Sequence, residues 1–279
     1  MFIIRSLVTL LFVFTVSIYA DDEIVVRAPT KFIENGKSIR LEIVIFKPEG
    51  PGPFPTLVFN HGSTGLGNNP AVFKKTVAPD FLADIFTTRG WLVAFPQRRG
   101  RGDSDGRYDE GFKPDRSRYS CIARYSLPGL DRAVEDLNAA VEYLKTRSDV
   151  STESMIVAGN SRGGILSIVY AGIHPEIFKG AINFVGGWIG EACWQVDEIN
   201  TNSFIRGAGF QKPTLWLYGE HDSYYSMAHS RKNFKSFVAA GGRGSFHAFS
   251  LGGSRNGHDL IFHTGLWIDI VDAYIGDIR

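Results

Sequence analysis

Residues 154–170 read SMIVAGNSRGGILSIVY and predict a strand, a sharp turn and a helix in direct succession. The short apolar run at 155–158 forms the strand, and a second apolar run of helical length follows the turn. The turn has the pattern Gly-x-Ser-x-Gly with Ser161 at its centre. Glycines fit on both sides of a strained serine because strand and helix must approach closely there. We predict that Ser161 is a nucleophile; the alternative is an ordinary tight turn.

The composition is that of a globular protein. The chain has 279 residues, 44% of them hydrophobic and 21% charged, which suits one domain with a sizeable core. The formal net charge of +1 favours neither nucleic acid nor an anionic membrane surface as a partner. The sequence contains no internal repeat and no low-complexity segment.

The first twenty residues differ from the rest. Arg5 is the only charge before an apolar run at 7–18, and Ala20 precedes an acidic pair. This arrangement predicts a secretory signal peptide over 1–20, followed by a single domain over 21–279 in the periplasm or outside the cell. The run is shorter than the roughly 20 apolar residues of a membrane span, so we expect no stable membrane insertion after cleavage. A retained N-terminal anchor is the alternative.

The two cysteines, Cys121 and Cys193, are an even number in a chain with an export signal. In an oxidising compartment a single disulfide is plausible. Two unpaired buried thiols are the other interpretation, because spacing does not show whether the Cα atoms lie close enough.

Strands alternate with helices along most of the chain. This order predicts an α/β fold, with a mostly parallel central sheet covered by helices on both faces. The expected strands are 24–27, 39–46, 56–60, 91–95, 155–158, 181–185, 213–218 and 245–251. The expected helices are 79–89, 130–147, 223–240 and 260–275, together with the helix that follows the Ser161 turn and runs to about residue 170. Strand 39–46 alternates apolar and polar residues, which is typical of a half-buried edge strand.

Two long excursions interrupt this pattern, at about 98–128 and 188–211. The first is rich in arginine but also holds aspartate and glutamate, so we interpret it as an internally compensated surface loop rather than an anion site. The second contains Trp188, Trp194 and Phe204, which either line an apolar pocket or pack under the loop.

A glycine-rich loop follows the buried strand at 56–60 and reads His-Gly-Ser-Thr-Gly from residue 61. We predict that the backbone N–H groups of Ser63 and Arg162 form an oxyanion hole. A phosphate loop is excluded because no Gly-Lys-Ser/Thr closes the segment. His61 is expected to brace this loop rather than to move protons.

An acid and a base complete the site. Asp222 follows the strand at 213–218, and His258 lies in the loop after the last strand. The chain order serine, acid, histidine is the order of the Gly-x-Ser-x-Gly elbow folds. Glu220 is a rival acid, and His221 and His263 are rival bases.

No metal or cofactor is expected. The histidines have no His-Glu-x-x-His spacing, and the two cysteines are too far apart in sequence for a zinc motif.

At this point the chain resembles the α/β-hydrolase superfamily, in its dienelactone hydrolase and prolyl-oligopeptidase-like branch. The resemblance covers about residues 39–279 and rests on the segments at 60–62, 98–104, 159–163, 219–222 and 256–259. Dienelactone hydrolases proper carry a cysteine nucleophile where this chain has Ser161, so their lactone substrate is not carried over. Peptidases of the related branch usually place a β-propeller before the hydrolase domain, for which we expect no room here.

The sequence thus predicts an exported serine hydrolase that cleaves small carboxylic esters by a Ser161–His258–Asp222 triad and an acyl-enzyme. A serine peptidase or amidase acting on short peptides is the second hypothesis. A non-catalytic binding protein on a hydrolase scaffold is the third.

Overall fold

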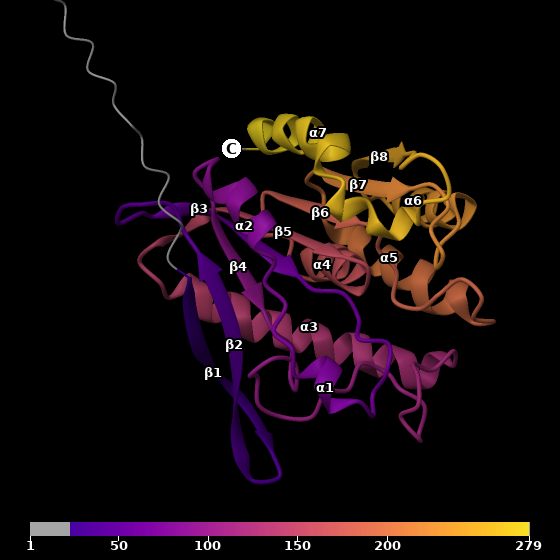
Figure 1. Cartoon of the computed structure of the whole chain (residues 1–279), viewed down its shortest axis with the longest axis horizontal. Helices are drawn as coiled ribbons and strands as arrows, with labels where there is room; N and C mark the ends of the chain where they lie inside the picture. Colours follow the sequence, from indigo (N-terminus) through magenta and orange to yellow (C-terminus); the bar gives the residue numbers. More distant parts are fainter. Residues whose placement is uncertain (1–22, 279) are drawn as a thin grey trace, which may run out of the picture.

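The structure, a computed structural model, describes residues 23–278 and contains one eight-stranded mixed sheet (Figure 1). The strand order is β1-β2-β4-β3-β5-β6-β7-β8. The β1–β2 and β2–β4 pairs are antiparallel, and all later neighbours are parallel. The strands are β1 (Ile24–Glu34), β2 (Lys37–Phe46), β3 (Phe54–Asn60), β4 (Leu92–Pro96), β5 (Val150–Asn160), β6 (Gly180–Phe184), β7 (Thr214–Gly219) and β8 (Gly244–Phe249).

Helices cover both faces of the sheet, which confirms the predicted fold class (Figure 1). The helices are α1 (Pro70–Phe73), α2 (Asp80–Thr87), α3 (Ala123–Lys145), α4 (Arg162–Ile173), α5 (Asn202–Arg206), α6 (Met227–Ala239) and α7 (Thr264–Asp277). On one face α3 contacts α4, α4 contacts α5, and α5 contacts α6. Arg89, two residues after the end of α2, forms an ion pair with Asp272 on α7.

The strand β2 differs from its prediction. It lies between β1 and β4, and Ile43, Val44 and Ile45 are all almost fully buried. The edge is β1, which is longer than predicted and alternates between partly buried and exposed residues. The predicted alternation in β2 was misleading because helices and β1 cover side chains that a true edge strand would leave in water.

The Asn35-Gly36 turn between the two strands has positive φ angles of 51° and 73°.

Helix α3 begins at Ala123, seven residues before the predicted start, and it contains Pro128. A proline inside a helix removes one backbone hydrogen bond, which is why the sequence indicated a boundary there. Tertiary packing overrides this preference. A Cβ on Gly129 would lie 2.1 Å from the carbonyl carbon of Glu110, so the helix is pressed against the first excursion.

The second excursion is less irregular than predicted. It holds the π-helical turn η1 (Asp197–Thr201), then α5 and the 3-10 turn η2 (Gly207–Gly209). Cys121 and Cys193 form a disulfide, so the two excursions are covalently joined.

The predicted closing helix is divided in two. The 3-10 turn η3 (Gly257–Phe262) comes first, α7 follows, and His263 lies between them. His258 is therefore held in a turn of η3 rather than in an open loop.

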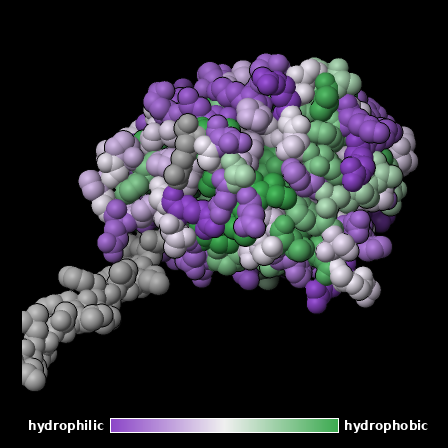
Figure 2. All heavy atoms as spheres, turned by 90° about the horizontal axis from the view of Figure 1, so that it is seen from above, coloured by the Kyte–Doolittle hydropathy of each residue, from purple (hydrophilic) through white to green (hydrophobic). Residues whose placement is uncertain are grey.

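The surface seen from above in Figure 2 has hydrophobic residues gathered near its centre and mostly hydrophilic residues around them. Within residues 23–278 no helix is long and apolar enough to cross a bilayer. The predicted signal peptide at 1–20 lies outside the described residues.

Candidate active site

Ser161 stands at a strained turn between β5 and α4. Its φ and ψ angles are 57° and −121°, a conformation that side-chain-bearing residues rarely adopt. The flanking glycines are required by close approach: a Cβ on Gly159 would lie 2.3 Å from Gly163, and one on Gly163 would lie 2.0 Å from the Asn60 carbonyl oxygen. The sequence pattern and the backbone geometry therefore agree on a nucleophile elbow.

The predicted oxyanion loop lies against this elbow. A Cβ built on Gly62 would be 3.4 Å from the Cβ of Ser161, and Ser63 lines the same cleft. Arg162 is the first residue of α4, so its backbone N–H has no acceptor within the helix. The two backbone groups predicted to bind an oxyanion thus belong to segments on either side of Ser161.

Asp222 and His258 are hydrogen-bonded. The His258 Nδ1 group donates to Asp222 Oδ2 at 2.8 Å. The other carboxylate oxygen accepts from the backbone N–H groups of Tyr224 and Tyr225 at 2.7 and 3.2 Å. The Asp222 side chain is fully buried, whereas that of His258 keeps 15% exposure. A proton held on Nδ1 leaves Nε2 as the nitrogen that can accept the serine proton.

Backbone contacts bring the acid turn and the histidine turn together. A Cβ on Gly219 would lie 2.3 Å from the Gly257 carbonyl oxygen. The Asn256 side-chain oxygen accepts from the backbone N–H groups of Ser223 and His258 at 3.0 and 3.1 Å. This bridge was not predicted, although the Asn-Gly before His258 is a turn signal.

The rival residues take other positions. Glu220 is exposed at the end of β7, where its backbone N–H donates to Phe249. His221 is exposed and adopts a φ of 60° in the acid turn. His263 precedes α7, and its backbone N–H donates to Leu260. Only His258 among residues 23–278 donates a ring hydrogen bond to Asp222.

Ser161 and His258 line a cleft of about 1050 Å³ that both excursions border. Trp188 and Trp194 line it, whereas Phe204 packs in the core against Trp216 at 4.6 Å. The two tryptophans of the second excursion therefore line a pocket, whereas Phe204 packs under the loop.

The sequence did not point to Tyr225, a buried residue of this cleft. Burial raises the pKa of its phenol, while a hydrogen bond with the Ser161 side chain acts in the opposite direction. The phenol therefore stays protonated at neutral pH and is available as a donor beside the nucleophile. The sequence feature that could have pointed to Tyr225 is its position three residues after Asp222.

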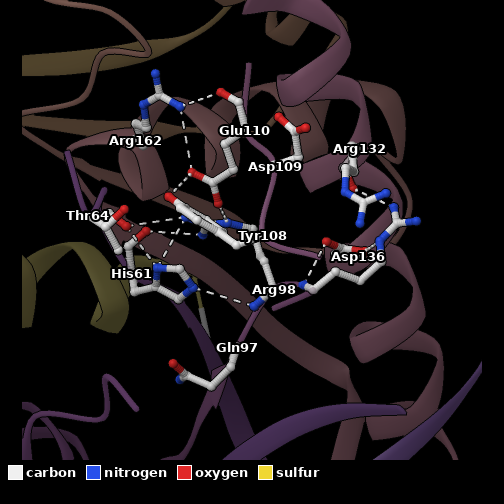
Figure 3. A network of polar contacts seen from close by, with 12 residues as sticks. His61, Thr64, Gln97, Arg98, Tyr108, Asp109, Glu110, Arg132, Asp136 and Arg162 are labelled. Atoms are coloured by element: carbon white, nitrogen blue, oxygen red, sulfur yellow. Dashed lines mark hydrogen bonds and ion pairs between the residues drawn. The ribbon is translucent and has the colours of Figure 1, made fainter. Parts of the chain in front are cut away.

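A buried polar network underlies the oxyanion side (Figure 3). Arg98 lies between His61 and Glu110: its Nη1 donates to the His61 carbonyl at 3.1 Å and its Nε to Glu110 at 2.5 Å. Burial, together with Arg98 and Arg101, holds the pKa of His61 well below its usual value. His61 is therefore neutral, and its hydrogen bonds with Arg98 fit the predicted bracing role. Arg98 and Arg162 hold the pKa of Glu110 below its usual value despite its burial.

The first excursion is compensated within itself only in part, and the arginines at its start are buried rather than at the surface. The side chains of Arg98, Arg99 and Arg101 are at most 6% exposed. Arg98 pairs with Glu110, and Arg99 pairs with Asp136 on α3. The sequence did not reveal this burial because the residues that neutralise Arg99 come from a distant helix.

No group of three or more histidine, cysteine, aspartate or glutamate residues able to hold a metal ion occurs within 23–278.

Comparison with known proteins shows what the chain is similar to. A sequence model of the serine aminopeptidase family S33 matches residues 76–191. The chain is 27% identical over 160 residues to a prolyl endopeptidase of Elizabethkingia meningoseptica, covering 57% of this chain and 19% of that enzyme. It spans about a fifth of the length of the curated relatives it matches.

Solved structures share the fold at low identity. Acetyl xylan esterase from Paenibacillus sp. R4 is 16% identical with a TM-score of 0.61, over 92% of this chain and 88% of that one. Acylaminoacyl peptidase from Pyrococcus horikoshii is 17% identical with a TM-score of 0.58, over 88% of this chain and 39% of that one.

These matches show the α/β-hydrolase fold, in which Ser161 and His258 line one cleft and His258 is hydrogen-bonded to Asp222. Within this fold, the matches include dienelactone hydrolase and prolyl-oligopeptidase-like proteins, so the resemblance seen in the sequence is confirmed.

Proposed function

We propose that the protein hydrolyses carboxylic esters, with Ser161 as nucleophile, His258 as general base and Asp222 as its carboxylate partner. The observation that carries this proposal is the 2.8 Å bond between His258 and the buried Asp222, in a cleft that His258 shares with the strained Ser161. The structural match that extends over 88% of acetyl xylan esterase supports an ester substrate.

The first half of the reaction is acylation. His258 Nε2 removes the hydroxyl proton as Ser161 Oγ attacks the ester carbonyl carbon. The backbone N–H groups of Ser63 and Arg162 hold the oxyanion, each contributing about 3 kcal/mol by analogy with other oxyanion holes. Asp222 stabilises the imidazolium and keeps its own charge. The ester C–O bond then breaks, and His258 gives its proton to the leaving alcohol.

Deacylation reverses these roles. His258 removes a proton from water, the hydroxide attacks the acyl carbon, and the oxyanion forms in the same hole. Collapse releases the carboxylic acid, and the proton returns to Ser161 Oγ.

A fluorophosphonate probe followed by peptide mapping tests the proposal. We expect the probe to label Ser161, and we expect Ser161→Ala and His258→Ala to abolish both labelling and ester turnover. Ser161→Ala should stay folded because a small side chain fits the elbow. Wild-type turnover in Ser161→Ala would overturn the proposal.

Peptide or amide hydrolysis is the second candidate, since the sequence match is to a prolyl endopeptidase. A matched pair of substrates separates the two: an ester and an amide with the same acyl and leaving-group skeletons. A higher kcat/KM for the amide would favour the peptidase.

We also propose that the protein acts in an oxidising compartment after export. The Cys121–Cys193 disulfide supports this, because such bonds persist outside the reducing cytosol. N-terminal sequencing of the protein from its native host should find cleavage after Ala20. An intact N-terminus, with both cysteines alkylated in freshly lysed cells, would contradict it.

A further inference from the structure

Three aromatic side chains lie exposed at the cleft that holds Ser161 and His258. Trp194 is 74% exposed, Phe262 66% and Tyr224 53%, and all three line the cleft. Every other large hydrophobic side chain that is exposed within residues 23–278 is aliphatic. Within residues 23–278 the exposed aromatic rings are therefore confined to this cleft, and apolar groups left in water at a cleft mark a binding surface.

The structure holds Trp194 at this rim. The residue before it, Cys193, is bonded to Cys121, so the tryptophan is tethered to the opposite excursion. The disulfide thus fixes the backbone beside Trp194. Preorganisation of this kind reduces the ordering entropy that ligand binding must overcome.

The other two rings are linked to the candidate base, Tyr224 by a ring contact and Phe262 by the turn and the cleft that it shares with His258. The Tyr224 ring is 4.6 Å from the His258 imidazole, and its backbone N–H donates to Asp222. Phe262 ends the same 3-10 turn that carries His258, and it packs on Phe81 at 5.6 Å.

This position assigns the rings to one part of the substrate. In acylation the proton that His258 took from Ser161 passes to the leaving oxygen while the new Ser161 acyl bond forms and the ester C–O bond breaks. The leaving alcohol therefore lies on the His258 side of the scissile bond. Tyr224 and Phe262 border that side, and the acyl group stays bonded to Ser161 when the alcohol departs.

We propose that the alcohol part of the ester carries a six-membered ring, either aryl or pyranose, whose face stacks on Trp194, Tyr224 and Phe262. An aryl ring can stack with an offset on an aromatic face, and a pyranose face presents polarised C–H groups that an aromatic face attracts. This inference rests on the proposed esterase function and adds its substrate class.

Three esters of primary alcohols test it with the full-length protein: ethyl acetate, benzyl acetate and a methyl glucopyranoside acetylated at its primary hydroxyl. All three give the same acetyl-enzyme, so kcat/KM differences report the alcohol alone. Butyrate esters of the same three alcohols serve as a control in case acetyl is a poor acyl group for this protein. The benzyl and glucopyranoside arms distinguish an aryl ring from a sugar ring.

We expect one ring-bearing ester to exceed the ethyl ester by at least about tenfold in kcat/KM, which corresponds to one or two ring stacks. Trp194→Ala and Phe262→Ala should each lower that ratio by about fivefold. Ile173→Ala, an exposed aliphatic site at the far end of α4, is the matched control and should leave the ratio within about twofold.

A wild-type ratio near one would overturn the inference, and so would rim variants that slow all three esters equally. Failure of the esterase proposal has a different signature, because the fluorophosphonate probe would leave Ser161 unlabelled and no ester would turn over. That result would overturn both.

Discussion

Two histidines border the site, one on each side of Ser161, and their neighbours carry opposite charges. His61 is 2% exposed and faces Arg98 and Arg101, which together with burial hold its pKa low. His258 is partly exposed and donates to the buried carboxylate of Asp222. Cations beside an imidazole disfavour its charged form, whereas a carboxylate stabilises it. The same residue type therefore braces a loop on one side and is suited to proton transfer on the other.

Removing the base should have the largest effect. We expect His258→Ala to lower kcat by about 10⁴-fold or more while the far-UV circular dichroism stays native. His61→Asn should keep most of the turnover of its folded fraction, because His61 lies outside the proton path. Steady-state kinetics on the two variants checks this, and a larger kcat loss in His61→Asn would reverse the assigned roles.

Replacing the candidate acid should have the second-largest effect on kcat. Asp222→Asn is expected to lower kcat by about 10³- to 10⁴-fold, because an amide stabilises neither the required tautomer nor the imidazolium. Glu220→Gln is the matched control on the same turn and should change kcat by less than about twofold. The opposite ranking of these two variants would move the acid to Glu220.

Disrupting the arginine network on the His61 side should lower the free energy of unfolding. Glu110→Gln leaves Arg98 and Arg162 buried without their carboxylate, and we expect a loss of about 3–5 kcal/mol in the free energy of unfolding. Glu135→Gln is the control: its carboxylate also pairs with a buried arginine but is 58% exposed, so the loss should stay below about 1 kcal/mol. Urea denaturation measures the loss for each variant. Equal losses would contradict the prediction that the buried Glu110 pairs stabilise the protein more than the exposed Glu135 pair.

The smallest effect concerns the pH dependence of stability. His61 stays neutral in the native state, whereas in the unfolded chain it binds a proton below about pH 6.5. Because the unfolded state then binds more protons, stability falls as the pH falls, by up to about 1.4 kcal/mol per unit below that value. We expect His61→Asn to lose less stability than the wild type between pH 7 and pH 5. The two proteins should show the same slope between pH 7 and pH 8, and parallel slopes throughout would refute the prediction.

Local rules account for what could be predicted. The strained Ser161 turn was visible because close backbone approach admits only glycine at positions 159 and 163. The start of α3 was missed because Pro128 is a local helix breaker, and the contact of Gly129 with Glu110 is not local. The burial of Arg99 was missed for a similar reason, since its partner Asp136 is 37 residues away.

The sequence by itself determined the alternation of strands and helices, the elbow at Ser161 and the chain order of Ser161, Asp222 and His258. These features depend on side-chain period, on turn chemistry and on which residues tolerate a strained backbone. Only the tertiary structure decided that Cys121 bonds Cys193, that Asp222 rather than Glu220 meets His258, and that three exposed aromatic rings share one cleft. Such outcomes depend on distances between segments far apart in the chain, which are set by the packing of the whole sheet and its helices.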